Sequence, residues 1–347
     1  MTRVGPGAFR LFLALVVLVS HSCRFDLGNW AVLMFFTLSG FWIHRMWAQK
    51  YSHARAPAAA FLVSRSLRLL PVFWLANLIA TAVQAALGPS LLSTSPLPVG
   101  WPAALVPNAL ILGYACLPKS LGALVPAWSL DIEVQFYLAF ALLMAVFARG
   151  SSKRVWIWTA AAASGLALFL YLRDTGEDAP RSVATYGLLF LAGAVASGTG
   201  WRPSRGLVTA SLVATLALVA ACALSPSLRP LVENMKHGAT VEDQQAKGAF
   251  QFALALLATP FALQTVRNAS GPTDRLLSEV TYIVYLIHLP VIRIHSRFFE
   301  HLPPLQRLPS MLAAWAAIAL LTVVVFRYYD QPLERMRRRW MASRFGV

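Results

Sequence analysis

The sequence predicts an all-α polytopic membrane protein with about ten transmembrane helices. Its 347 residues are 58% hydrophobic and 13% charged, whereas about 25% of the residues of an ordinary soluble domain are charged. Apolar stretches long enough to cross a bilayer recur from one end of the chain to the other. No loop between them has room for a large soluble domain. We therefore expect one integral-membrane domain over residues 1–347, with no appended soluble domain.

The apolar stretches define ten expected spans in chain order. They cover residues 8–24, 29–48, 66–88, 127–148, 155–172, 183–198, 206–224, 248–266, 279–297 and 309–327. Residues 101–117 are also apolar, but Pro102 and Pro107 interrupt them and leave a run too short to cross the hydrocarbon core. We expect this stretch to be a re-entrant or interfacial segment.

The net charge of the chain is +16, and the basic residues are distributed unevenly between the two sides of the predicted spans. Arginines and lysines gather between residues 45 and 68 and between residues 335 and 339, and both regions fall on the same side when ten spans are counted. Because cytoplasmic loops carry the excess of basic residues, we expect both termini in the cytoplasm and a multi-pass protein of the inner or plasma membrane. No basic run is interleaved with aromatic residues as in a base-stacking platform, so we expect no nucleic-acid partner.

The first span contains two polar residues, Arg10 and His21. In a helix they lie about 20° apart around the axis and about 16 Å apart along it. One helix face would then carry a cation near the cytoplasm and an imidazole toward the other side. Such residues are costly in lipid and indicate function, although a snorkelling arginine and an interfacial histidine at the helix ends would explain them too.

The fourth span begins within PAWSLDIEVQFYL and supplies a carboxylate. We expect Ser129 to cap the helix and Asp131 to interact favourably with the helix dipole in the first turn. Glu133 lies about one turn deeper, with Ser129 and Tyr137 on its own face. Since this helix enters from the outer side, Glu133 reaches the depth of His21 and could orient its imidazole. A structural hydrogen-bond network between helices is the alternative.

Two arginines, Arg65 and Arg68, lie three residues apart at the predicted cytoplasmic entrance of the third span. Two guanidinium groups there could clamp phosphates, or they could simply anchor the span at the cytoplasmic surface.

Several polar or aromatic residues within the spans form a candidate substrate channel: Ser39, Trp128, Tyr137, Tyr282 and His288. For Ser39, which precedes Gly40, helix packing is an equally good explanation. For His288, a histidine satisfied between helices is the simpler one. The other histidines and the three cysteines show no ligand spacing, so we expect no metal site and no bound cofactor.

Taken together, five motifs resemble the acyltransferase 3 family of membrane acyltransferases. In chain order they are the arginine and histidine separated by ten residues, FFTLSGF, RSLR before LLP, AWSLDIEVQFYL and TYIVYLIHLP. The resemblance implies about ten helices that move an acyl group, usually acetyl, from a cytoplasmic donor to a hydroxyl group of an extracytoplasmic glycan or glycosylated molecule. The implied partners are acyl-CoA (acetyl-CoA as the expected donor), a carbohydrate-containing acceptor and the lipid bilayer.

The resemblance also implies roles for individual residues. It makes His21 the catalytic histidine and Arg10 its motif partner, it gives Arg65 and Arg68 a part in donor handling, and it places Glu133 at the glutamate of the family pattern. One departure is Asp330-Gln331-Pro332, where family members often have Glu-x-Pro. We interpret this as a conservative change of little consequence.

Two other functions compete with acyl transfer. A proton-coupled transporter or flippase of a glycan or lipid-linked substrate could use Arg10, His21 and Glu133 as a proton relay. A glycan-binding membrane subunit would perform no chemistry. Consumption of labelled acyl-CoA distinguishes the enzyme from both.

Overall fold

The computed structural model describes residues 4–87, 101–116, 124–147, 153–173, 181–234 and 240–347. These residues are almost entirely helical, and no strand occurs among them. The chain divides into two compact units, one made of residues 1–49 and 146–278 and the other of residues 50–145 and 279–347. We call them the first and the second unit and describe each by itself.

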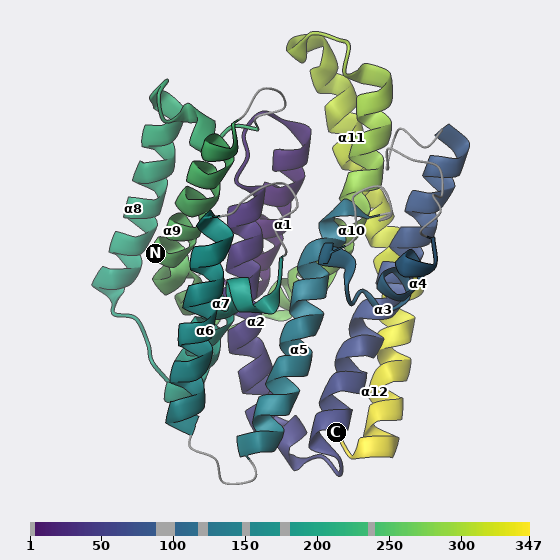
Figure 1. Cartoon of the computed structure of the whole chain (residues 1–347). Coiled ribbons are helices and arrows are strands. Elements are labelled where there is room, and N and C mark those ends of the chain that lie inside the picture. The colour runs from purple at the N-terminus through teal and green to yellow at the C-terminus, as the bar shows by residue number, and fades with distance from the viewer. Residues whose placement is uncertain (1–3, 88–100, 117–123, 148–152, 174–180, 235–239) are drawn as a thin grey trace. The chain divides into compact units, whose positions relative to one another are not determined.

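The first unit is organised around the second helix of the chain, which packs against the first, seventh and ninth helices (Figure 1). Its helices are α1 (Pro6–Ser22), α2 (Gly28–Gln49), α6 (Lys153–Arg173), α7 (Val183–Thr199), α8 (Arg205–Leu224), the short η5 (Arg229–Leu231) and α9 (Val241–Thr265). The start of α10 (Pro272–Phe299) also belongs to this unit. There, the Asp274 carboxylate accepts hydrogen bonds from the backbone N–H groups of Gly7 (3.1 Å) and Ala8 (2.9 Å). This satisfies two donors at the N-terminus of α1.

Two glycines allow α2 and α7 to lie in close contact. A Cβ atom built on Gly40 would lie 2.0 Å from the Phe190 carbonyl oxygen, and one built on Gly193 would lie 2.0 Å from the Thr37 carbonyl oxygen. The rings of Phe36 and Phe190 stack beside this contact, with centroids 4.8 Å apart. Small residues that let two backbones approach are typical of membrane helix pairs, so packing explains Gly40.

The second unit contains the longest helices of the chain. Its elements are η1 (Tyr51–His53), α3 (Pro57–Leu87), α4 (Trp101–Leu110), η3 (Tyr114–Cys116), η4 (Val125–Ala127), α5 (Trp128–Phe147), most of α10, α11 (Pro304–Val325), the π-helical segment η6 (Phe326–Asp330) and α12 (Gln331–Phe345). The last three follow one another without a break, in green to yellow in Figure 1. The N–H of Arg55 donates to the Phe345 carbonyl oxygen, so the end of α12 lies beside the start of α3.

The predicted all-α membrane class is confirmed, and each expected span coincides with a helix among the described residues. Within those residues six helices are long and apolar enough to cross a membrane: Pro57–Val83, Trp128–Phe147, Arg205–Leu224, Val241–Thr265, Pro272–Phe299 and Pro304–Phe345. Shorter apolar helices cover Pro6–Ser22, Ile157–Leu170 and Val183–Thr199. The count of ten spans, the single domain and the cytoplasmic position of the termini stay predictions.

Several helix boundaries differ from the predicted spans. The third helix begins at Pro57 instead of residue 66, α10 begins at Pro272 instead of 279, and the last helix runs on to Phe345 instead of ending at 327. Hydropathy marks where a chain enters lipid, whereas a helix continues beyond it wherever good helix formers such as alanine and arginine follow. The helix from Pro304 to Phe345 is about 63 Å long, twice the hydrocarbon thickness. We therefore expect its arginine-rich α12 part to extend out of the membrane.

In the segment 101–117, the described residues 101–116 contain no helix that could cross a bilayer. Helix α4 has ten residues and is about 15 Å long. The chain then turns through two residues with positive φ, Ile111 (68°) and Gly113 (89°). A re-entrant or interfacial position for this segment agrees with these observations and stays a prediction, and residue 117 lies outside the described residues.

We predict that Gly40→Ala weakens the contact between α2 and α7 because the added methyl group overlaps the Phe190 carbonyl. The expected cost is about 1–3 kcal/mol, measured as a lower midpoint of thermal unfolding of the detergent-solubilised protein. Gly206→Ala is the matched control, since nothing lies within 4 Å of its added Cβ. Equal midpoints for the two variants would contradict the proposed close contact.

Candidate functional site

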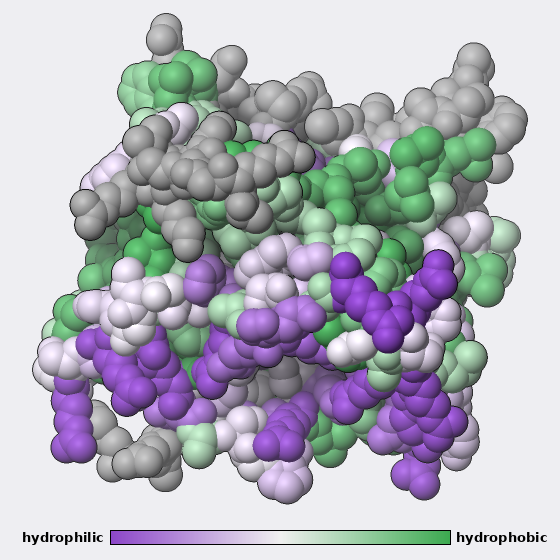
Figure 2. Space-filling model, turned by 90° about the horizontal axis from the view of Figure 1, so that it is seen from below, coloured by the Kyte–Doolittle hydropathy of each residue, from purple (hydrophilic) through white to green (hydrophobic). Residues whose placement is uncertain are grey.

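A cavity of about 390 Å³ in the second unit is lined by charged side chains of α3, α10, η6 and α12. Among the described residues its lining comprises five arginines, three carboxylates and two further side chains: Arg65, Arg68, Arg335, Arg337, Arg338, Glu279, Asp330, Glu334, Phe326 and Gln331. Helix α12 ends at the lower end of Figure 1, and the view of that end in Figure 2 shows hydrophilic residues gathered in patches. The excess of arginine suits an anionic ligand.

The two arginines of RSLR lie inside α3, two to three turns after its start, and their position at the cytoplasmic entrance of the membrane span stays a prediction. The Arg68 Nη1 atom donates to Asp330 Oδ1 at 2.5 Å, and the carboxylate is buried, with 7% of its side chain exposed. Asp330 is the last residue of the π-helical segment η6. A buried carboxylate is costly unless it is paired, so this ion pair joins η6 to α3.

Two tyrosines connect neighbouring helices to α3 around Pro71. The Tyr282 hydroxyl of α10 donates to the Leu69 carbonyl oxygen (2.9 Å), and the Tyr329 hydroxyl of η6 donates to the Pro71 carbonyl oxygen (3.1 Å). A backbone carbonyl oxygen has two lone pairs, so it can accept a hydrogen bond from another helix in addition to the bond within its own helix. Tyr282, assigned to a candidate substrate channel, therefore has a clear structural role beside the arginine pair.

Helix α12 contributes a second set of charge-assisted bonds centred on Glu334. Arg337 binds this carboxylate through two nitrogens, Nε to Oε2 at 2.7 Å and Nη2 to Oε1 at 2.6 Å. Arg338 Nε donates to Oε1 at 2.7 Å. The third nitrogen of Arg337, Nη1, donates to the Ser64 hydroxyl of α3. Bidentate pairs of this kind fix the plane of the guanidinium group, so Arg337 is held in one orientation.

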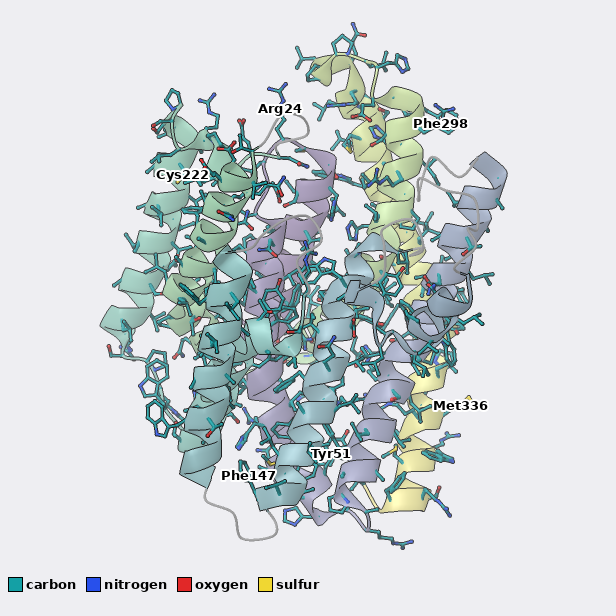
Figure 3. The ribbon with its side chains drawn as sticks, in the orientation of Figure 1. Arg24, Tyr51, Phe147, Cys222, Phe298 and Met336 are labelled. Carbon is teal, nitrogen blue, oxygen red and sulfur yellow. The ribbon has the colours of Figure 1, made fainter. Side chains whose placement is uncertain are left out.

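Tyr51 lies next to this network and is almost fully buried; it is labelled in Figure 3. Its hydroxyl is 2.7 Å from Ser64 Oγ, and the guanidinium carbon of Arg65 lies 5.9 Å from its ring centroid. Burial raises the pKa of the Tyr51 phenol, but the charge of Arg65, hydrogen bonds with Ser64 and Arg65 and the charge of Lys50 outweigh burial and leave the pKa below its ordinary value. The ring face and the phenol oxygen thus both stabilise Arg65.

The arrangement of the arginines suits phosphate better than a single carboxylate. Planar guanidinium groups present parallel N–H donors that match phosphate oxygens. Several of them around one cavity can neutralise a ligand with more than one phosphate. No group of three histidine, cysteine, aspartate or glutamate side chains that could hold a metal ion occurs in the described part of the chain.

Helix α5 carries a second polar group, around Glu133. The Tyr137 hydroxyl donates to Glu133 Oε1 at 2.6 Å, as the shared helix face predicts. Ser129 is not the N-cap that the sequence predicts, because α5 already begins at Trp128. Its hydroxyl instead donates to the Pro126 carbonyl oxygen (3.1 Å) and lies 2.7 Å from the Tyr285 hydroxyl of α10. Ser129 therefore helps to join α5 to α10.

Asp131 has a more specific role than the favourable dipole interaction expected for it. It is fully buried and accepts hydrogen bonds from Gly113 N (3.0 Å), Ala115 N (2.7 Å) and Gln135 Nε2 (3.0 Å). Asp131 thus holds the turn after α4 against the start of α5.

His288 is also fully buried. Its Nδ1 lies 3.2 Å from the Val284 carbonyl oxygen one turn earlier in α10. A carbonyl oxygen can only accept a hydrogen bond, so Nδ1 carries the hydrogen. This hydrogen bond lies within α10 itself, so a histidine satisfied between helices and a part in the channel both stay predictions for His288.

The residues of the first motif lie on one helix of the first unit. Arg10 and His21 both belong to α1, with Arg10 half-buried in its second turn and His21 exposed in its last turn. Ser39 is buried in α2, next to the glycine that contacts α7, and Trp128, the first residue of α5, is half-buried. Because Glu133 and most of the candidate channel belong to the second unit, the pairing of Glu133 with His21 and the channel stay predictions.

The site residues that the sequence predicts do not include Asp330, Glu334 and Arg337. The sequence predicts little consequence for the replacement at Asp330, and the arginines of α12 indicate only the topology of the chain. The available signal is the spacing of carboxylates and arginines at positions 330, 334, 337 and 338, which places them on one helix face. No comparable pattern in the sequence predicts the π-helical segment that turns this face toward α3.

We predict that Asp131→Ala loosens the turn over residues 111–116 because it leaves two backbone N–H groups without their acceptor. Each lost acceptor costs about 1–3 kcal/mol, so thermal unfolding should shift to lower temperature and limited proteolysis should cut this turn faster. Asp131→Asn keeps one carbonyl oxygen and should give a smaller change. Proteolysis unchanged in Asp131→Ala would show that the carboxylate does not hold the turn.

A family model described as an acyltransferase domain matches residues 3–328. No curated protein and no solved structure matches the chain.

Proposed function

Because the chain belongs to the acyltransferase 3 family, whose model covers nearly its whole length, we propose that this membrane acyltransferase takes its acyl group from acyl-CoA at the cytoplasmic face. The acceptor is a hydroxyl group of an extracytoplasmic glycan or glycosylated molecule, and the acyl group is acetyl. The protein acts in the inner or plasma membrane.

The observation that carries the proposed donor is the arginine-lined cavity. Coenzyme A ends in a nucleotide with several phosphate groups, which guanidinium groups bind well. Arg65 and Arg68 would bind these phosphates, and Arg10 would bind polar parts of the donor within the membrane. A proton-coupled transporter, the competing function, has no need of this cavity.

The proposed chemistry uses His21 as a general base. The imidazole takes the proton from the acceptor hydroxyl as its oxygen attacks the thioester carbonyl carbon. The carbon–sulfur bond then breaks, and His21 returns the proton to the departing thiolate of coenzyme A. Glu133 would fix the imidazole tautomer and raise its basicity. An acyl-histidine intermediate, with His21 as the nucleophile, is the alternative route.

We predict that His21→Ala abolishes acyl transfer and leaves expression and membrane insertion unchanged. The loss should be at least about 100-fold, in line with the usual contribution of general acid–base catalysis. Release of coenzyme A from labelled acetyl-CoA by the purified protein, with a glycan acceptor present, measures it. His301→Ala is the control, because it removes an exposed imidazole outside the site. Full activity of His21→Ala would rule out the proposed role.

We predict that Arg65→Gln raises the KM for acetyl-CoA about ten-fold with little change in kcat, because Arg65 binds the donor without taking part in the reaction. Arg68→Gln should act in the same direction. Arg293→Gln, which removes an exposed arginine of α10 outside the cavity, should leave both constants unchanged. A fall in kcat at constant KM for Arg65→Gln would contradict the phosphate clamp.

A further inference from the structure

One wall of the arginine-lined cavity comes from residues beyond the family match, which ends at residue 328. We propose that this wall, formed by Asp330 and α12, recognises the 3′-phosphorylated nucleotide of the donor. Arg335 binds its phosphate, and Asp330 and Glu334 are positioning residues that hold Arg68 and Arg337 around the cavity. The inference rests on the proposed function, because it takes coenzyme A as the donor.

Two of the three carboxylates of the cavity serve to orient arginines, because they are already engaged by them. Asp330 is paired with Arg68, and both oxygens of Glu334 accept hydrogen bonds from Arg337. A carboxylate facing an incoming phosphate without such pairing would repel it. Paired in this way, the two acids fix the guanidinium groups in advance, so that less conformational entropy is lost when a ligand binds.

Arg335 differs from its neighbours on α12. Arg337 and Arg338 are bound to Glu334, whereas Arg335 takes part in no ion pair that the structure describes among its placed residues. It lines the cavity and is exposed. Its guanidinium group can therefore bind a phosphate without breaking an existing pair.

The charge and size of the cavity point to a phosphorylated nucleotide and not to a single small anion. Among the described residues, five arginines surround it against three carboxylates, so the lining stays positive. Its volume of about 390 Å³ is in the range of sites for small organic molecules, roughly 300–1,000 Å³. A terminal phosphate monoester carries about two negative charges at neutral pH. The 3′-phosphate is therefore the group of coenzyme A that such a lining would bind most strongly.

The π-helical segment explains how α12 comes to face α3. Each π turn contains more residues than an α turn, so Phe326–Asp330 changes the register of everything that follows. The segment is held to α3 at two points, through the Tyr329 hydroxyl and the Asp330 carboxylate. π-helical turns inside α-helices occur frequently at functional sites, and here the turn places Asp330 and Glu334 on the wall of the cavity.

The test compares binding of coenzyme A and dephospho-coenzyme A, which differ only in the 3′-phosphate. Isothermal titration calorimetry on the full-length, detergent-solubilised protein should show coenzyme A binding about ten-fold more tightly. Arg335→Gln should reduce this ratio to near one by weakening coenzyme A alone. The matched control is Arg339→Gln, which removes the same charge from α12 outside the cavity and should keep the ratio. A ratio that persists in Arg335→Gln, or falls equally in Arg339→Gln, would overturn the inference.

Asp330 is tested through kinetic constants. Asp330→Asn should raise the KM for acetyl-CoA several-fold at constant kcat, because it releases Arg68 without touching the reacting atoms. Asp330→Glu restores the charge and should recover most of the lost affinity. A purely structural role predicts instead that kcat falls with the amount of folded protein and that KM is unchanged. If Asp330→Asn does not fold, the Arg335→Gln comparison decides alone.

Failure of this inference can be told apart from failure of the proposed function. Consumption of acetyl-CoA together with equal binding of the two coenzymes would refute the role of α12 and leave the enzyme activity standing. Selective binding of coenzyme A that depends on Arg335, without any turnover, would support the site and refute acyl transfer.

Discussion

The ion pair between Arg68 and Asp330 determines the arrangement of the candidate donor site. A buried carboxylate needs a partner, and this one can find it only if η6 lies against α3. Once these elements are together, Glu334 and Arg337 follow on the next turns of α12, and Arg337 reaches Ser64 on α3. Tyr51 completes the group from η1. Together these contacts form the cavity with its excess of arginine.

Much of the fold could be predicted because the bilayer requires apolar helices. The expected spans coincide with helices, and Gly40 lies at a close helix contact. Helix ends could not be predicted equally well, because a helix such as α3 or the one ending at Phe345 does not stop where lipid does. The π-helical turn could not be predicted either, since it depends on tertiary contacts of Tyr329 and Asp330.

The candidate site was predicted in part. The residue types and spacing of Arg65 and Arg68 indicated phosphate binding, and both arginines line the cavity. Their partners were missed because a carboxylate more than 250 positions away in the sequence gives no local sign that it will pair with Arg68. Partners of polar residues on α5 could not be predicted either. Ser129 and Asp131 fit simple capping rules, yet Ser129 lies at hydrogen-bond distance from α10 and Asp131 accepts hydrogen bonds from the turn after α4. Local rules identify polar residues in membrane helices but do not identify their partners.

In the proposed reaction, an acyl group passes from a donor on the α12 side of the membrane to an acceptor on the other side. Sealed proteoliposomes with a single orientation of the protein test it most directly. Labelled acetyl-CoA is supplied on one side and a hydroxyl-bearing oligosaccharide on the other. We expect labelled oligosaccharide only when acetyl-CoA is on the side of α12, the proposed cytoplasmic side. Equal labelling from both sides, or uptake of intact substrate without acyl transfer, would contradict it.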